Sequence, residues 1–284
     1  MVQYRMTPQT LKQHVIKRTV APDTTATACD FVAGETGLSK MRVKDAMNKG
    51  ALWIRKKGTL KRLRRATAEL HSGDYVEFYY DEALLSVRPP PAKCLRDEGH
   101  YSLWYKPPGL LAQGTMYGDH CALDRQAEIF FGPSRKVFIV HRLDREVSGL
   151  MLLAHTREAA ARLSELFRKG LVVKHYRAEV LGNLLSRGSR GMIDLPLDGK
   201  PSATEFTVDS YNPERGISTV TIMMRTGRHH QIRRHFAMFG YPLMGDPRYG
   251  KGNKNTEGLK LSAVSLRFHC PFRGRDVDYM LPEL

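Results

Sequence analysis

The sequence predicts an α+β protein with a small basic N-terminal domain and a larger, strand-rich C-terminal domain. From Tyr101 onward, short apolar stretches alternate with turns that contain Gly or Pro, and one clear helix lies among them. Before this region, residues 40–65 carry eleven basic side chains and one acidic side chain. Three consecutive prolines at 89–91 separate the two regions. We therefore predict a small α/β domain at 1–80, a linker at 81–97 and an α+β domain at 98–284.

The N-terminal domain is predicted to contain a helix, a strand, a basic loop and a second strand. Ser39 is placed to cap a helix whose apolar side chains recur at helical spacing, and Gly50 is placed to end it. A strand-like ALWI follows at 51–54. After the basic loop and the turn at 72–74 comes the apolar strand YVEFYY at 75–80. The interleaved apolar positions favour a folded unit with one basic face over an unstructured tail.

The charge of the chain favours a polyanionic partner. The 284 residues include 45 Lys and Arg against 29 Asp and Glu, for a net charge of +16. The longest apolar runs, such as 149–154, are too short to span a membrane, and the N-terminus has no apolar signal segment. The four cysteines are widely spaced without a zinc pattern. We expect a cytoplasmic monomer that binds nucleic acid; a merely solvated basic face is the alternative.

The C-terminal domain has one clear helix and one polar turn between strands. Thr156 begins the helix and Gly170 ends it, with its apolar side chains on one face. Just before it, residues 141–145 (HRLDR) lie between two apolar strands and precede a flexible pair, Ser148-Gly149. Asp144, between two arginines, should be ionised. Such a loop is a usual place for active-site residues, but taken by itself an HRLD turn is more often structural ion pairing than catalysis.

A second polar cluster occupies residues 225–250. Its apolar spacing predicts a helix entered through Gly227, on which Arg233 and Arg234 point about 100° apart. One arginine can therefore face a carboxylate while the other faces solvent or phosphate. Three histidines invite a metal site, but no carboxylate or cysteine joins them at ligand spacing, so we expect neither metal nor cofactor and assign them to hydrogen bonds or RNA contacts: His229, His230 and His235.

Several motifs together resemble the RluA-type pseudouridine synthases over about residues 98–275. The resemblance implies their fold, a mixed and mostly antiparallel bent sheet with flanking helices and a central cleft. It also implies isomerisation of uridine in RNA without a cofactor. The motifs occur in the family's order: KPPGL (106–110), HRLDREVSGLMLLA (141–154), KHYRAEVLG (174–182), KPSATEFTV (200–208), TGRHHQIRRHFAMFGYPLMGDPRYG (226–250) and LKLSAVSLRFHCPFRG (259–274).

The resemblance also assigns roles to individual residues. Asp144 matches the catalytic aspartate and Arg233 the arginine paired with it. Tyr176 matches the tyrosine beside the target base, and it is a candidate to remove the C5 proton. Arg142 matches the arginine that enters the RNA where the uridine has flipped out, and His141 beside it is assigned to RNA binding. Whether Asp144 attacks C1′ or C6, or assists proton removal, is left open.

Residues 15–80 resemble an S4-type RNA-binding domain through GLSKMRVKDAMNKGALWI (37–54) and LHSGDYVEFYY (70–80). The family commonly has Val-Asn-Gly after the helix, whereas this chain has a longer basic loop that begins at Trp53. A generic basic adaptor is the alternative. We predict that cations of this face bind the RNA backbone: Lys40, Arg42, Lys44, Arg55, Lys56, Lys57 and Lys61.

The sequence therefore predicts an RNA pseudouridine synthase whose main substrate is 23S ribosomal RNA. Transfer RNA is the alternative substrate, and an inactive RNA-binding or ribosome-assembly factor on the same fold is the alternative function. Val147 and Ser262 stand where the family commonly has threonine and histidine. Because neither belongs to the assigned catalytic set, they bear on substrate identity rather than on the reaction.

Overall fold

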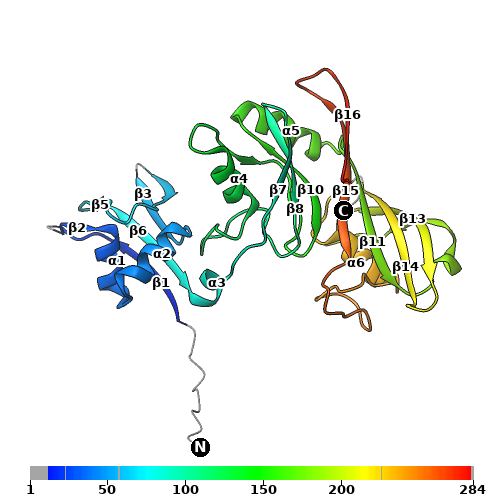
Figure 1. Ribbon diagram of the computed structural model, residues 1–284, viewed down its shortest axis with the longest axis horizontal. Coiled ribbons are helices and arrows are strands. Elements are labelled where there is room, and N and C mark those ends of the chain that lie inside the picture. Colours follow the sequence, from blue (N-terminus) through cyan, green and yellow to red (C-terminus); the bar gives the residue numbers. More distant parts are fainter. Residues whose placement is uncertain (1–11, 23, 57, 225, 283–284) are drawn as a thin grey trace, which may run out of the picture. The chain divides into compact units, whose positions relative to one another are not determined.

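The computed structural model describes residues 12–22, 24–56, 58–224 and 226–282, which fold into two compact units (Figure 1). Unit 1 contains the chain up to Pro89 and the segment 113–125. Unit 2 contains residues 90–112 and 126–284. The segment 113–125 therefore belongs to the smaller unit, although the sequence predicted it within the C-terminal domain. It is held there by Trp53, whose Nε1 donates to the Met116 carbonyl oxygen at 2.9 Å.

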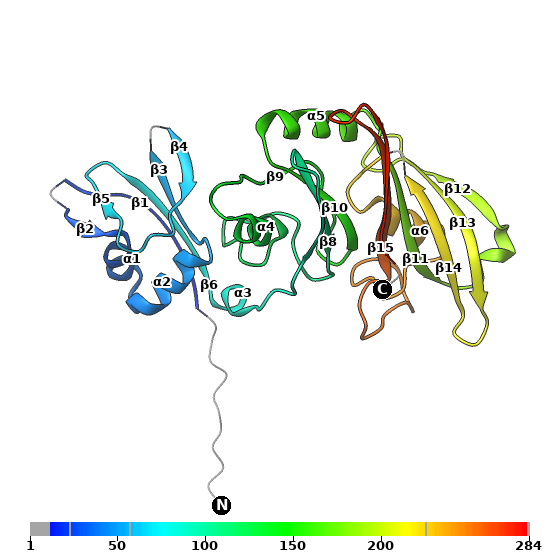
Figure 2. The same ribbon diagram turned by 45° about the horizontal axis from the view of Figure 1, so that its top comes forward.

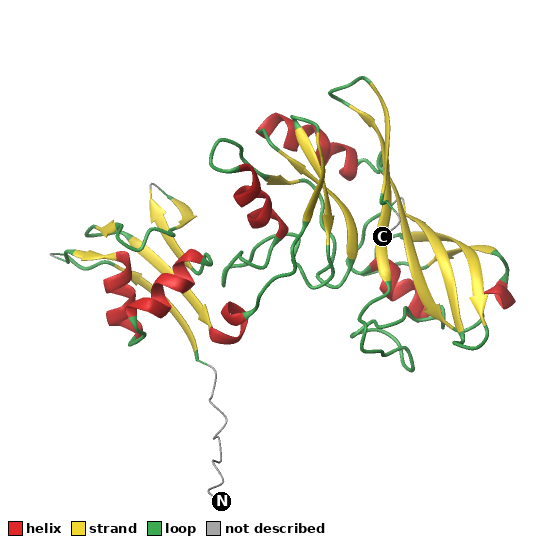
Figure 3. Ribbon diagram, in the orientation of Figure 1, coloured by secondary structure: helices red, strands yellow, loops and turns green. Residues whose placement is uncertain are grey.

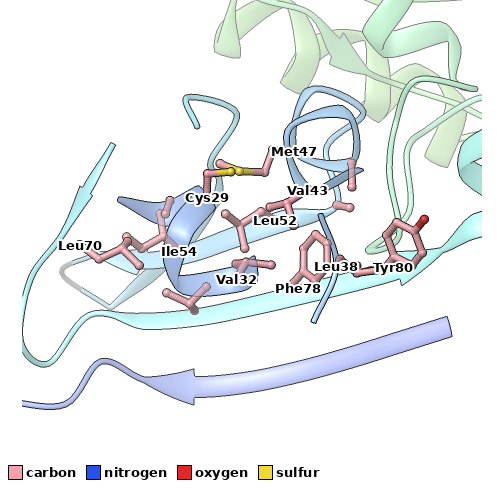
Figure 4. Close-up of a cluster of buried hydrophobic side chains, with 14 of the residues drawn as sticks. Cys29, Val32, Leu38, Val43, Met47, Leu52, Ile54, Leu70, Phe78 and Tyr80 are labelled. Atoms are coloured by element: carbon pink, nitrogen blue, oxygen red, sulfur yellow. The ribbon is translucent and has the colours of Figure 1, made fainter. Parts of the chain in front are cut away.

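Unit 1 is a four-stranded antiparallel sheet, in the order β1-β6-β3-β4, covered by two helices (Figure 3). Val32 and Val43 of the helices pack with Leu52 and Phe78 of the sheet in the core, which Figure 4 shows. The elements are β1 (Gln13–Thr19), β2 (Ala26–Thr27), α1 (Ala28–Thr36), α2 (Lys40–Asn48), β3 (Leu52–Lys56), β4 (Thr59–Arg62), β5 (Glu69–Leu70), β6 (Tyr75–Asp81) and α3 (Glu82–Ser86).

The predicted basic helix is confirmed as α2. Ser39 caps it, because its side chain accepts a hydrogen bond from the backbone N–H of Arg42 at 3.4 Å. The C-cap is Lys49, one residue before the predicted Gly50. Gly50 instead makes the left-handed turn after the helix, with φ +87°, and a Cβ there would lie 2.7 Å from the Asp119 carboxylate. Only glycine fits both conditions.

The prediction that residues 81–97 form an extended linker is wrong. Asp81 ends β6 and its side chain caps α3, accepting from the backbone N–H of Leu84 at 3.0 Å. Residues 93–97 form strand β7, whose backbone pairs antiparallel with β8. Regular structure is lacking only over 87–92, around the three prolines, since proline can supply no N–H to a helix or a ladder.

Unit 2 is built on one large, mostly antiparallel sheet, which confirms the predicted α+β class. Leu163 of α5 packs against Leu150, Leu152 and Leu266 of this sheet. The elements are β7 (Lys93–Asp97), β8 (Tyr101–Lys106), α4 (Leu123–Phe131, which starts in unit 1), β9 (Phe138–Ile139), β10 (Ser148–Ala154), α5 (Arg157–Arg168), β11 (Val173–Leu181), η1 (Leu184–Arg187), β12 (Arg190–Asp194), β13 (Ala203–Asn212), β14 (Ile217–Met224), α6 (Gln231–Met238), β15 (Leu261–Cys270) and β16 (Arg275–Met280).

The large sheet consists of two antiparallel parts joined at one short parallel pairing (Figure 2). One part contains β7, β8, β9 and β10, and the other contains β11 to β16. Strands β10 and β15 join them through two residue pairs, Ser148 with Ser262 and Gly149 with Ala263. A Cβ on Gly149 would collide with the backbone of Ala263. Ser148-Gly149, predicted to be a flexible pair, is therefore a point of close strand contact.

Both helices predicted in the C-terminal domain are present. Helix α5 starts after Thr156, whose hydroxyl accepts from the backbone N–H of Ala159 at 3.0 Å. Its C-cap is Lys169, and the predicted Gly170 follows it at φ +69°. Helix α6 starts at Gln231 rather than near Gly227, since residues 227–230 form a separate turn. Within the described ranges, no helix is both long and apolar enough to cross a bilayer.

Candidate active site

A cavity of about 740 Å³ in unit 2 brings the predicted site residues together. It lies where the two parts of the sheet meet, since its lining comes from the turn before β10, from β11, from α5 and from the start of α6. All five predicted residues of this domain contribute to the lining: His141, Arg142, Asp144, Tyr176 and Arg233.

The turn that carries Asp144 is fixed by a buried lysine. Lys106 ends β8, is fully buried, and its Nζ donates to the carbonyl oxygens of Pro107 at 3.0 Å, Leu110 at 2.8 Å and Arg145 at 3.3 Å. Burial lowers the pKa of Lys106 to about 8, against the opposing effect of the carboxylates of Asp144 and Glu146. The KPPGL motif thus acts as an internal support for the turn.

Arg233 is buried at the centre of a network of three carboxylates. Its Nε and Nη2 form a bidentate pair with Asp246, at 2.8 and 2.9 Å. Its remaining Nη1 lies 3.3 Å from both Asp144 Oδ2 and Glu146 Oε2. The sequence predicted that Arg233 pairs with Asp144, and the structure shows that contact through Nη1 alone, because the bidentate fork of Arg233 is taken by Asp246.

Asp246 was missed by the sequence analysis, although it lies in the quoted GDPRYG segment. It is fully buried, and its Oδ1 also accepts the backbone N–H groups of Arg248 at 2.8 Å and Tyr249 at 3.1 Å. Burial alone would raise the pKa of Asp246, but the hydrogen bonds from Arg233 and these backbone groups keep it below its usual value. The sequence did offer a signal for Asp246, because it is an acidic residue in the same motif as Arg233.

Tyr176 lies on β11 with only 8% of its surface exposed. Lys174 stands two residues before it and also lines the cavity, as the alternation of a strand requires. Burial, and then the charge of Asp144, raise the pKa of Tyr176 well above its usual range. The hydroxyl is therefore protonated at neutral pH, which argues against the phenolate as the base that removes the C5 proton.

Two cations at the cavity make no polar side-chain contact within the described ranges. Arg142 is exposed and Lys174 is half-buried, and neither forms an ion pair or side-chain hydrogen bond with another described residue. Other lining cations make such contacts: Lys169 Nζ lies 2.8 Å from Glu165, and Arg228 donates to the Pro201 carbonyl oxygen at 3.3 Å. An anionic ligand in the cavity would therefore find Arg142 and Lys174 available to bind it.

His141 has structural partners inside unit 2. Its Nε2 accepts the backbone N–H of Leu152 at 2.9 Å, and its ring stacks on Phe167 with centroids 4.1 Å apart. Burial, with a smaller effect of Lys174, lowers the pKa of His141 to about 3. These contacts account for the residue without RNA, so its assignment to RNA binding stays a prediction.

The three histidines of the second cluster serve different purposes. His235 is fully buried, with Nδ1 2.9 Å from the Thr204 hydroxyl and Nε2 3.0 Å from the Leu195 carbonyl oxygen. His230 instead reaches the site, with its Nε2 3.5 Å from Asp144 Oδ2, and His229 stacks on it. Across the described part of the chain, no group of three or more His, Cys, Asp or Glu is arranged to hold a metal ion.

The basic face of unit 1 is partly neutralised by its own carboxylates. Among the predicted RNA-binding residues, Lys40 pairs with Asp30 at 2.7 Å and Arg42 with Glu82 at 3.2 Å. The Arg55 guanidinium lies over the Tyr75 ring. Lys57 lies outside the described residues. Of the predicted RNA-binding residues, Lys44, Lys56 and Lys61 are exposed and form no ion pair with another described residue.

Comparisons with known proteins agree with this geometry. The sequence pattern of the RNA pseudouridylate synthase family matches residues 100–238. The dual-specificity RNA pseudouridine synthase RluA of Vibrio vulnificus is 33% identical over 213 residues, which cover 66% of this chain and 83% of that protein. The chain belongs to the RluA-type family of RNA pseudouridine synthases. It is thus an isomerase that acts on RNA.

Two more distant pseudouridine synthases bear on the substrate and on the fold. Ribosomal large subunit pseudouridine synthase D of Vibrio vulnificus is 30% identical over 172 residues, which cover 51% of each chain. Among solved structures, human RNA pseudouridylate synthase domain containing 1 covers 69% of this chain and 86% of its own, with a TM-score of 0.57 and 23% identity. That structural likeness supports the pseudouridine synthase fold.

The arginine pair gives a first prediction. Arg233→Lys should lower kcat at least about tenfold, because an ammonium cannot hold Asp246 through a planar fork and reach Asp144 as well. Arg234→Lys is the matched control, since Arg234 forms its bidentate pair with Asp198 on the surface, at 2.9 and 3.0 Å. It should stay within about threefold of wild type in a tritium-release assay. The reverse ranking would contradict the assignment.

His141 gives a pH prediction. Its folded-state pKa of about 3 lies below the unfolded value of about 6.5, so below pH 6.5 the unfolded chain binds a proton that the folded chain refuses. The stability from the neutral ring is present above pH 6.5 and is lost progressively as the pH falls toward 3. Between pH 7 and 5 the loss should be about 1 to 2 kcal/mol.

Urea denaturation at both pH values measures this loss. His141→Gln, which keeps an acceptor for the Leu152 N–H but cannot be protonated, should lose less stability than wild type over the same interval. An equal loss in the two proteins would show that His141 is not the group responsible.

Proposed function

We propose that this pseudouridine synthase isomerises uridines of large-subunit ribosomal RNA, with Asp144 as its catalytic group. The observation that carries the assignment of Asp144 is its place in the cavity: its carboxylate lies against Arg233, which Asp246 holds rigidly from behind. The carboxylate is 28% exposed, so a ligand can reach it. A fixed and accessible carboxylate suits attack at C1′ or C6 of the nucleoside, or proton removal at C1′.

The cavity suits a nucleotide taken out of the RNA stack. At about 740 Å³ it has room for a base and its sugar. Tyr176 offers an aromatic ring beside Asp144, and base stacking on such rings supports a flipped-out nucleotide. The unpaired cations Arg142 and Lys174 stand at the same cavity, where they can bind the phosphates on either side of that nucleotide.

Ribosomal RNA is the favoured substrate for two reasons. One relative is named a ribosomal large subunit pseudouridine synthase. In addition, unit 1 presents the free cations Lys44, Lys56 and Lys61, which we assign to the backbone of a large structured RNA, in an S4-like manner. Transfer RNA is the second candidate, favoured by the dual specificity in the name of the relative RluA. We propose that the enzyme works as a monomer in the cytoplasm.

The catalytic assignment predicts the behaviour of Asp144→Asn. The amide is nearly isosteric but can neither attack nor accept a proton, so kcat should fall below about one-hundredth of wild type. RNA affinity should change less than about threefold, because the lost group is an anion that binds no phosphate. Tritium release from labelled RNA and filter binding measure the two quantities. Turnover of the variant within tenfold of wild type would exclude Asp144 as the catalytic group. Tritium release by the wild-type protein would exclude the alternative of an inactive assembly factor.

The assignment of unit 1 predicts the salt dependence of RNA binding. Lys44→Ser, Lys56→Ser and Lys61→Ser combined should weaken binding and lower the slope of log affinity against log salt by roughly 0.7 to 0.9 per lost contact. Saturating RNA should restore kcat, since these residues lie outside the catalytic cavity. Arg18→Ser is the control, because Arg18 is paired with Glu35 at 3.3 Å. An unchanged slope in the triple variant would contradict the RNA-binding role of these lysines and would favour the alternative, a solvated basic surface.

A further inference from the structure

His230 has a backbone conformation that side-chain-bearing residues rarely adopt. It lies directly before α6 with φ +52° and ψ +32°, in the left-handed region. Within the described residues, only Asp198 shares a positive φ without being glycine, and aspartate is one of the residues that tolerate it. Histidine is found there more often than most residues, but the conformation still costs free energy for any residue with a Cβ, and such strain clusters at functional sites.

Helix capping does not account for the strain. His230 occupies the N-cap position of α6, but its side chain accepts no hydrogen bond from the helix. Gln231 braces the turn before the helix, since its Oε1 accepts the backbone N–H of Arg228 at 3.0 Å. A glycine at 230 would serve the backbone equally well, so the reason for histidine lies in its ring.

The ring of His230 lies between Tyr249 and Asp144. Its Nδ1 is 2.9 Å from the Tyr249 hydroxyl, and its Nε2 is 3.5 Å from Asp144 Oδ2, with 7% of the side chain exposed. The neutral tautomer with its proton on Nε2 is favoured, because the other tautomer would point the Nε2 lone pair at the negative carboxylate. Nδ1 is then an acceptor, and Tyr249 must donate to it. The tyrosine therefore selects the tautomer that presents a donor to Asp144.

The two groups that approach Asp144 meet the same oxygen. Arg233 Nη1 at 3.3 Å and His230 Nε2 at 3.5 Å both face Oδ2. Among the described residues, the hydrogen bond to this carboxylate goes to Oδ2, and no hydrogen bond is made to Oδ1. We propose that His230, set by Tyr249, is a positioning residue that orients the Asp144 carboxylate through Oδ2 and leaves Oδ1 to the substrate.

The charge around the ring is consistent with this role. Burial lowers the pKa of His230, and the charges of Arg233 and Arg248, together with the adjacent His229, lower it further, whereas Asp144 opposes them. The ring is therefore neutral at neutral pH. A neutral donor restrains the rotation of the carboxylate without adding a second full positive charge that would weaken Asp144 as a nucleophile or base.

The inference rests on the proposed catalytic role of Asp144. Its test compares variants that keep the left-handed backbone of residue 230 but change or remove the imidazole ring. His230→Gly removes the ring and suits the left-handed backbone, so the melting temperature should be equal to or above that of wild type. We expect kcat to fall at least about tenfold while RNA affinity stays within about threefold. His230→Gln, whose amide can again donate toward Oδ2, should recover part of kcat. Asp198→Gly, which relaxes the same conformation on the surface, is the control and should keep wild-type kcat.

Tyr249→Phe tests whether the Tyr249 hydroxyl acts on Asp144 through the His230 ring. It should lower kcat less than His230→Gly does, and the double variant should be no slower than His230→Gly alone, since the hydroxyl acts only through the ring. Wild-type kcat in His230→Gly would overturn the proposal, and additive effects would overturn the role of Tyr249. An active Asp144→Asn would instead overturn the proposed function, so the two failures are distinguishable.

Discussion

The site depends on the bidentate pair between Arg233 and Asp246. Both side chains are buried, and neither charge would be tolerable there without the other. The pair fixes the guanidinium so that one nitrogen remains for Asp144 and Glu146. It also fixes the chain around Tyr249, since Asp246 accepts the backbone N–H of that residue. One internal ion pair thus places the groups on both sides of the Asp144 carboxylate.

Opposite roles for adjacent residues recur through the chain. Arg233 and Arg234 differ by one position, yet one is buried among carboxylates and the other forms a surface pair with Asp198. In unit 1, Arg64 is half-buried and pairs with the buried carboxylate of Asp119, although the sequence groups it with the basic face. The number of cations therefore overstates the charge available to RNA. Position on the helix or strand decides which of them face solvent.

Local patterns predicted much of this structure. Ser39 and Thr156 start their helices as expected, and the ordered motifs placed Asp144, Tyr176 and Arg233 around one cavity. The sequence could not predict contacts between distant segments, because the spacing of residues along the chain does not show which segments meet in the fold. Asp246 as the main partner of Arg233 is one such case. The ring of His230 is another, since its direction follows from a backbone conformation that no residue pattern announces.

The narrow joint between the two parts of the sheet has a mechanical meaning. Only two residue pairs connect β10 to β15, and Asp144 comes from one side of this joint while Tyr176 and Arg233 come from the other. Ala263 pairs with both Gly149 and Tyr176, so the joint and the aromatic wall share one residue. A Cβ at position 149 would strike the backbone of Ala263 and push the two strands apart, which would change the separation of the Asp144 carboxylate from the Tyr176 ring. The separation of the two halves of the site therefore depends on the absence of a side chain at position 149.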